Sequence, residues 1–202
     1  MLVWLLLIPI IKLVYMSCLH PLTVINPSKR ISLNGGAPYQ LQVPCGSCAN
    51  CRHSKHDEYF FRAFYQGKST FDKGGFMQAI TLTYRPSCLP HLSDFLPIPK
   101  GDILDFPCFS RKDIRVFLVR LRERLYRLGY DCKDKLNYFI ASEYGTSSVG
   151  THRPHYHIIF YVTFAIDAFE FSRIVGQCWP FGISDTIPFK PRAYVLRYTF
   201  GP

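Results

Sequence analysis

The sequence predicts an α+β domain with a mostly antiparallel central sheet and flanking helices. Three strand-like runs, 76–84, 136–143 and 155–162, are interspersed with amphipathic helical runs. No glycine-rich βαβ fingerprint accompanies them, which argues against a parallel, doubly wound sheet. The length of 202 residues suits one domain with its own core plus a small appendage, and excludes a processive polymerase within this chain.

The first helix and the first strand are expected between residues 54 and 84. Ser54 and Asp57 form a capping box, and apolar residues at helical spacing follow until Gly67, which predicts a short helix. The run 76–84 alternates isoleucine and leucine with threonine and is rich in β-branched residues, which predicts a strand.

The clearest helix is expected between Ser110 and Gly129. Asp113 completes a capping box with Ser110, and phenylalanine and leucine recur on one face. The other faces are rich in arginine, and a solvated surface is the ordinary use of such charges. We expect one or two of these arginines, with Arg115 and Arg122 as candidates, to contact DNA phosphates.

The second half of the chain predicts a strand pair and two further helices. The runs 136–143 and 155–162 are joined by a loop rich in Gly, Ser and Thr, which favours an antiparallel pair. Residues 167–178 predict a helix, and Pro191 is a favourable opening for a last helix that ends near residue 198.

The charge balance indicates a polyanionic partner. The chain carries 24 Lys and Arg against 14 Asp and Glu, a formal net charge of +10, with a pI of about 9.3. Apolar residues make up 48% of the chain, which excludes disorder over most of its length. Nucleic acid is the simplest such partner.

The first fifteen residues form an apolar run that does not resemble a signal peptide. The run has no basic segment before it and no cleavage site after it, and it is too short to span a bilayer. We expect residues 1–15 to be an N-terminal extension, with translation starting at Met16 and no stable membrane association; a membrane anchor is the alternative. Residues 16–75 then form a cysteine-rich segment with a helix, and residues 76–202 form the main domain.

A C-x-x-C-x-x-C run indicates a metal site. Cys45, Cys48 and Cys51 can converge on one soft metal, whereas an iron–sulfur run would need a further cysteine where Lys55 stands, so zinc is the better candidate. A turn with three free thiols is the alternative. Candidates for a fourth ligand are Cys18, Cys88, His53 and His56.

The triplet His155-Tyr156-His157 is the sharpest local feature. In a strand, residues i and i+2 project from the same face, with Cα atoms roughly 6.5 Å apart, so both imidazoles can reach one cation. Glu143 ends the preceding strand, and an antiparallel pair can bring its carboxylate beside the histidines. Such a His-His-Glu set suits Mg²⁺ or Mn²⁺ at a phosphate, with zinc as another possibility.

Two tyrosines four residues apart form a second feature. Tyr194 and Tyr198 would share one face of a helix, as core aromatic pairs do. Lys190, Arg192 and Arg197 surround them, and such a basic setting can hold a phosphodiester and favour the phenolate.

The chain resembles the replication initiators of the small single-stranded DNA phages of the Microviridae (gokushovirus-like), within the HUH endonuclease superfamily. Four blocks carry the resemblance in order: PCGSCANCR at 44–52, ITLTY at 80–84, SEYG with RPHYHIIF within 142–160, and AYVLRY at 193–198. The opening MSCLHP from Met16 is also similar to the start of that family.

The resemblance implies a ferredoxin-like or RRM-like palm. The HUH motif falls on His155 and His157 as metal ligands on a central strand, and the third, acidic ligand falls on Glu143. The HUH endonuclease domain would be 76–202, and its Mg²⁺ or Mn²⁺ would polarise the scissile phosphate.

The resemblance also implies the nucleophiles. The paired tyrosines of the family fall on Tyr194 and Tyr198, with Arg197 at the basic position. Attack on single-stranded DNA at the viral origin would yield a 5′-phosphotyrosyl enzyme and a free 3′-hydroxyl that primes rolling-circle synthesis. The family motif is usually followed by lysine and further chain, whereas here 199–202 follow, so a C-terminally truncated chain is in question and Tyr194 is the preferred nucleophile.

Alternatives from other classes remain open at this point. A non-catalytic single-stranded nucleic-acid-binding protein could use the 16% aromatic residues as stacking platforms. A transposase or plasmid relaxase with HUH chemistry is the nearest enzymatic rival. For the leading hypothesis, the host replication machinery is a further expected partner, and the cytoplasm of the bacterial host is the expected location.

Overall fold

The structure, a computed structural model, describes residues 18–25, 40–145 and 153–187. The chain divides into two compact units, Met1–Arg62 and Ala63–Pro202. Helix α2 (Ala49–Asp72) contributes residues to both of them. None of the helices in the described ranges has the length and hydropathy needed to cross a membrane.

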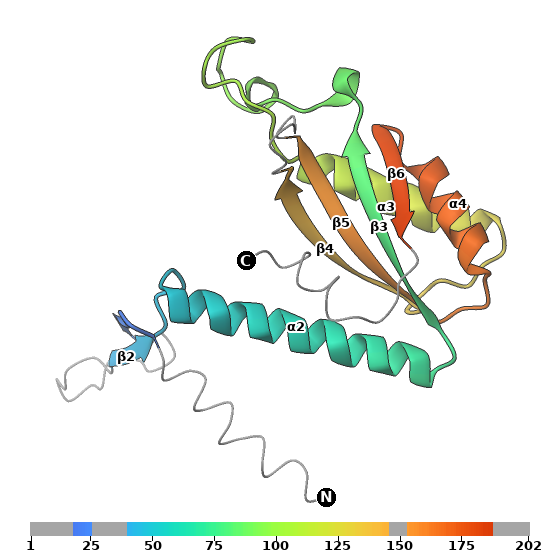
Figure 1. The fold of residues 1–202 in the computed structure, drawn as a ribbon, viewed down its shortest axis with the longest axis horizontal. Coiled ribbons are helices and arrows are strands. Elements are labelled where there is room, and N and C mark those ends of the chain that lie inside the picture. Colours follow the sequence, from blue (N-terminus) through green and yellow to red (C-terminus); the bar gives the residue numbers. More distant parts are fainter. Residues whose placement is uncertain (1–17, 26–39, 146–152, 188–202) are drawn as a thin grey trace, which may run out of the picture. The chain divides into compact units, whose positions relative to one another are not determined.

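The second unit has a β-α-β-β-α-β element order. Its four strands form one antiparallel sheet in the order β4-β5-β3-β6, which is the ferredoxin-like arrangement and confirms the predicted α+β class (Figure 1). Strand β5 is interior, between β4 and β3. The elements are β3 (Phe76–Tyr84), α3 (Arg111–Arg127), β4 (Leu136–Tyr144), β5 (Pro154–Val162), α4 (Ala168–Cys178) and β6 (Gly182–Ile187).

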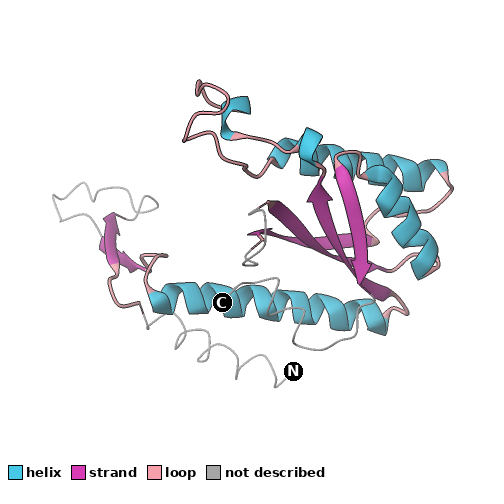
Figure 2. Ribbon diagram, turned by 45° about the horizontal axis from the view of Figure 1, so that its top comes forward, coloured by secondary structure: helices cyan, strands magenta, loops and turns pink. Residues whose placement is uncertain are grey.

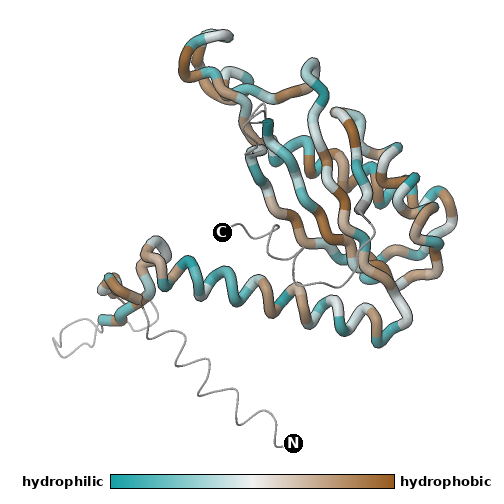
Figure 3. Tube along the Cα trace, viewed as in Figure 1, coloured by the Kyte–Doolittle hydropathy of each residue, from teal (hydrophilic) through white to brown (hydrophobic). Residues whose placement is uncertain are grey.

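The core of this unit lies between the sheet and the helices α3 and α4, which cover one face of it (Figure 2). Leu82 and Phe160 of the sheet and Phe117 and Phe171 of the helices are fully buried there. Burying a side chain of this size contributes about 1.5–3 kcal/mol, so this face supplies most of the stability of the unit. Strand β5 begins hydrophilic and becomes hydrophobic in its second half (Figure 3).

Helix α3 forms where its pattern predicts. The Ser110 hydroxyl accepts a hydrogen bond from the backbone N–H of Asp113 at 3.2 Å, so Ser110 is the N-cap. Helix α4 begins in the same way, with the Asp167 carboxylate accepting from the N–H groups of Phe169 and Glu170. Both capped helices confirm the predicted positions to within a residue or two.

The prediction of a short helix between Ser54 and Gly67 is wrong, because α2 runs from Ala49 to Asp72. Ser54 lies inside the helix rather than at its start, since the cysteine run itself leads into the first turn. Gly67 does not end the helix because it is a packing position: a side chain there would meet Met77 and Tyr161 of the sheet.

Several described elements have no counterpart in the sequence prediction. Strands β1 (Leu22–Ile25) and β2 (Gln40–Val43) form a two-stranded antiparallel sheet in the first unit. Strand β6 adds an edge to the main sheet by pairing with β3.

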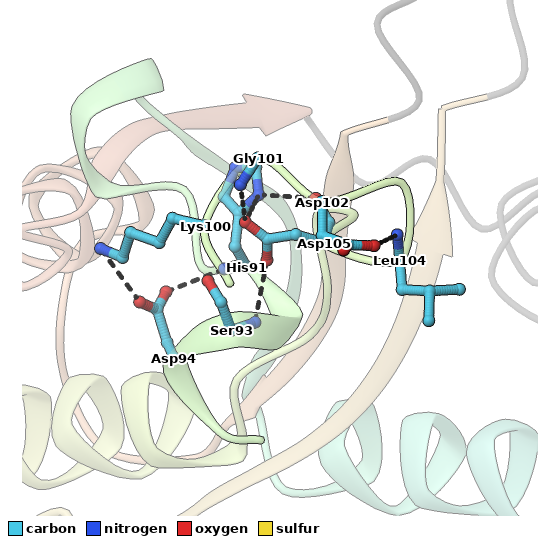
Figure 4. A network of polar contacts seen from close by, with 8 residues as sticks. All are labelled: His91, Ser93, Asp94, Lys100, Gly101, Asp102, Leu104 and Asp105. Atoms are coloured by element: carbon cyan, nitrogen blue, oxygen red, sulfur yellow. Dashed lines mark hydrogen bonds and ion pairs between the residues drawn. The ribbon is translucent and has the colours of Figure 1, made fainter. Parts of the chain in front are cut away.

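The connection between β3 and α3 is organised around one carboxylate (Figure 4). Asp105 accepts hydrogen bonds from the backbone N–H groups of Ser93 at 2.9 Å and Gly101 at 3.0 Å. The ring Nδ1 of His91 lies 3.2 Å from the carbonyl oxygen of Asp105. The loop is thereby ordered although Ile103, at its tip, is 95% exposed.

Candidate metal and DNA site

The predicted ligands come together on the face of the sheet opposite to α3 and α4. Glu143 is paired in register with His155 across β4 and β5, and His155 is paired with Thr83 on its other side. His157 lies two residues along, paired with Thr81. Side chains of registered partners share a face, so the antiparallel pairing expected between 136–143 and 155–162 places the acid beside the histidines.

Two threonines of β3 hold the imidazole rings. The Thr81 hydroxyl lies 3.1 Å from Nδ1 of His157, and the Thr83 hydroxyl lies 2.9 Å from Nδ1 of His155. With Nδ1 occupied by a hydroxyl, Nε2 of each ring is the nitrogen presented for a ligand or a proton. Both rings are therefore oriented by the neighbouring strand.

Glu143 lies against His157. Its Oε2 is 3.3 Å from Nε2 of His157, and the two side chains are 42% and 32% exposed. These exposures leave the pair accessible to a ligand as large as a DNA phosphate while the backbone beneath stays in the sheet.

His155 is held in its neutral form. Partial burial, together with the nearby His157 and Arg153, lowers the pKa of His155, and Glu143 opposes this shift. A neutral imidazole is the form that binds metals. Gly145 lies next to this ring, because a Cβ on Gly145 would be 3.1 Å from Nε2 of His155.

Tyr156, between the two histidines, points to the opposite face and anchors the strand. Its hydroxyl accepts a hydrogen bond from the backbone N–H of Ser110 at 2.8 Å and lies 3.3 Å from the hydroxyl of Tyr84. The Tyr84 hydroxyl in turn donates to Asp113 at 2.9 Å. The start of α3 is thus tied to the residue that separates the histidines.

The buried phenols near the site are poor nucleophiles. Burial raises the pKa of Tyr84 and of Tyr156, and it raises the pKa of Tyr161 to about 12. A phenol must lose its proton to attack phosphorus, so these three tyrosines are suited to packing and hydrogen bonding.

The donor set of Glu143, His155 and His157 fits a divalent cation in its chemistry. Two imidazole nitrogens and one carboxylate oxygen are ligands that Mn²⁺ and Zn²⁺ share, and carboxylate oxygen suits Mg²⁺. Their ligand atoms are not gathered as closely as those of four cysteines. Within the described ranges, Cys18, Cys45, Cys48 and Cys51 are the one His, Cys, Asp or Glu group whose ligand atoms all lie within 4.8 Å of one another.

The cysteine group can hold a metal ion. The sequence indicates Cys45, Cys48 and Cys51 and leaves the fourth ligand open among four candidates; in the structure Cys18 is the fourth member. Hydrogen bonds from the backbone N–H groups of Ser47 and Cys48 lower the pKa of the Cys45 thiol to about 5, which favours the thiolate that metals bind.

Other predicted DNA-binding residues lie elsewhere or outside the described ranges. Arg115 and Arg122 are exposed on α3, which packs on the face opposite to the histidines. The guanidinium of Arg122 lies over the ring of Tyr138 at 5.6 Å. Residues outside the described ranges are Lys190, Arg192, Tyr194, Arg197 and Tyr198.

Sequence reasoning missed the two threonines and Gly145. Thr81 and Thr83 alternate with the same period of two as the histidines, so a pairing of the two strands could have identified them. Gly145 had a weaker signal, since its role depends on the ring of His155 across the strand pair.

The comparisons with known proteins concern mainly the second unit. No curated protein and no solved structure matches the chain. A family model for replication-associated proteins of the ORF2 type matches residues 77–200, more than half of the 202 residues. This stretch includes the strands that bear Glu143, His155 and His157. The chain therefore belongs to this family of replication-associated proteins.

Proposed function

We propose that this replication-associated protein initiates rolling-circle replication by nicking and rejoining single-stranded DNA. The observation that carries the proposal is the shared face of Glu143, His155 and His157, with Nδ1 of each histidine held by a threonine and the His157–Glu143 pair accessible. An accessible carboxylate–imidazole set on an interior strand suits the binding of a cation together with a phosphodiester.

Glu143, His155 and His157 would hold Mg²⁺ or Mn²⁺. Such a cation, when bound, polarises the scissile phosphate as a Lewis acid. The threonines keep both Nε2 atoms directed away from β3, and the depressed pKa of His155 keeps its ring neutral at physiological pH. The ordered sheet thus provides a prearranged donor set, which reduces the cost of assembling it around DNA.

The covalent step is assigned to Tyr194. Its phenolate oxygen would attack phosphorus in line, forming a P–O bond to tyrosine while the bond from phosphorus to the 3′-oxygen breaks. The departing 3′-oxygen takes up a proton and becomes the 3′-hydroxyl that primes synthesis. Tyr198 would repeat the attack to rejoin the displaced strand, with Arg197 supplying positive charge near the phosphate. Lys190, Arg192, Arg115 and Arg122 are the proposed contacts to the DNA backbone.

Further parts of the proposal concern family, cofactor and setting. The chemistry is that of HUH endonucleases, and the nearest group is the Microviridae initiators. Zinc is the proposed ion for the cysteine group. We place the protein in the cytoplasm of a bacterial host, working with the host replication machinery.

The test is covalent capture of DNA. The full chain is incubated with circular single-stranded DNA carrying the replication origin of the parent genome, with and without Mn²⁺, and then denatured. We expect a denaturant-resistant protein–DNA band that needs Mn²⁺ and is lost in His157→Ala and in the double variant Tyr194→Phe with Tyr198→Phe. His53→Ala and Tyr138→Phe are matched controls at exposed positions and should keep the band.

A second outcome would favour the binding-module alternative. If wild-type protein retains DNA in a salt-sensitive way but forms no covalent band, the nicking proposal is wrong and the chain acts by binding. A band that survives in His157→Ala would contradict the assigned role of the histidine site.

A further inference from the structure

Four cysteines converge in the first unit, outside the stretch that the family model matches. Cys18 precedes β1, whereas Cys45, Cys48 and Cys51 lie between β2 and the first turn of α2. The matched stretch begins at residue 77, so family membership says nothing about this group.

The sulfur geometry is that of a tetrahedral thiolate site. Sγ of Cys18 lies 3.9 Å from Sγ of Cys48, and Sγ of Cys45 lies 3.9 Å from Sγ of Cys51. Four sulfurs at about 2.3 Å from a central zinc ion are separated by about 3.8 Å at the edges of a tetrahedron. A disulfide needs about 2.05 Å, so neither sulfur pair is bonded.

Backbone amides surround the sulfurs as donors. The N–H of Cys45 donates to Sγ of Cys18 at 3.3 Å, the N–H of Cys48 to Sγ of Cys45 at 3.4 Å, and the N–H of Cys51 to Sγ of Cys48 at 3.4 Å. Such donors stabilise the negative charge of thiolates. Gly46, with φ at +76°, makes the tight turn that brings the Cys48 amide back to Cys45.

The surrounding sheet needs a constraint of this kind. Strands β1 and β2 have four residues each, and every residue of β1 is exposed. An isolated two-stranded ribbon with so little burial is marginal in water. A metal that joins the residue before β1 to the residues after β2 would supply the folding free energy that burial does not.

We propose that Cys18, Cys45, Cys48 and Cys51 bind one zinc ion and that this closed site folds the first unit. All four positions of a tetrahedron are taken by protein thiolates, which is typical of a structural zinc site and leaves no open position for catalysis. Cys18 is the ligand that the sequence leaves undecided, and it makes the site depend on a segment 27 residues before Cys45.

The test is the metal content of the full chain after expression in zinc-containing medium. We expect one tightly held zinc per chain by elemental analysis and native mass spectrometry. Cys18→Ser and Cys45→Ser should each lose most of it, whereas Cys108→Ser, a cysteine outside the group, should retain it. His157→Ala should also retain it, which separates this ion from any metal at the histidine site.

A measurement on the wild-type chain covers the case in which the serine variants fail to fold. Replacing the ion with Co²⁺ should produce thiolate-to-cobalt charge-transfer absorption and the d–d bands of a tetrahedral site. Octahedral d–d bands without thiolate charge transfer would overturn the proposal. So would unchanged zinc in Cys18→Ser, and so would iron in place of zinc.

Discussion

The orientation of the histidines depends on two hydroxyl groups. The hydroxyls of Thr81 and Thr83 contact the Nδ1 atoms of His157 and His155. Outer contacts of this kind fix the tautomer and ring angle of a ligand, and their loss typically weakens metal affinity by about 10–100-fold.

We therefore expect the double variant Thr81→Val with Thr83→Val to bind Mn²⁺ more weakly by about 10–100-fold, with the fold unchanged because valine keeps the shape and β propensity of threonine. Titration calorimetry with Mn²⁺ measures this. Thr163→Val is the matched control: its hydroxyl donates to the carbonyl of Lys135 at the other end of β5, and its loss should leave Mn²⁺ affinity as it is. Equal affinity in the double variant would contradict the orienting role.

At the scale of elements, Tyr156 couples β5 to α3. Removing its hydroxyl in Tyr156→Phe leaves the buried N–H of Ser110 without its partner, which costs about 1–3 kcal/mol of the free energy of unfolding. Urea unfolding measures the difference. Tyr138→Phe removes a hydroxyl from a side chain that is 37% exposed and should change stability little. Equal stability of the two variants would show that the anchor contributes nothing.

The loop before α3 should be sensitive to acid. Backbone N–H groups of Ser93 and Gly101, with a smaller contribution from His91, lower the pKa of Asp105 below its ordinary value. A depressed carboxyl pKa means that the carboxylate contributes order above a pH of about 4, and that this contribution is lost as the pH falls through the folded value.

Hydrogen exchange should show this loss at the amides of Ser93 and Gly101. We expect their protection to fall below pH about 4, and to fall at neutral pH in Asp105→Asn, because the amide keeps one acceptor oxygen in place of two. Asp72→Asn, at an exposed carboxylate of α2, is the control. Full protection of both amides in Asp105→Asn would mean that the loop is ordered by other contacts.

The predictability of the elements follows the strength of their local signals. Helix α3 combines an N-cap, an acidic first turn and a long apolar face, so the sequence alone locates it. Strand β6 is six residues of mixed polarity and exists because β3 offers a free edge, which is a tertiary cause. Helix α2 is longer than predicted because Gly67 looks like a stop signal unless its packing against Met77 is known.

The candidate site divides in the same way. Glu143 could be placed beside His155 because antiparallel pairing across a loop follows simple register rules. The choice of Cys18 could not be made, since a ligand so far along the chain from Cys45 is brought in by the pairing of β1 with β2.

At the scale of the whole molecule, the two units should respond differently to metal removal. If zinc folds the first unit, a strong chelator should abolish hydrogen-exchange protection in β1 and β2 while β3 and β5 keep theirs, because the second unit has its own apolar core. Exchange followed by mass spectrometry resolves the two sets of peptides, and added zinc should restore the first. Loss of protection in β3 and β5 as well would show that the units fold together.

The two faces of β5 leave the molecule unequal freedom to change. His155 and His157 face the accessible side, whereas Tyr156, Ile158 and Phe160 are buried against the helices. In a saturation library, substitutions at the first two positions should abolish DNA cleavage at normal cellular abundance, and substitutions at the other three should lower abundance itself. Activity and solubility would thus be lost at alternate residues of one strand, so a designer could retune the chemistry of this protein without rebuilding its interior.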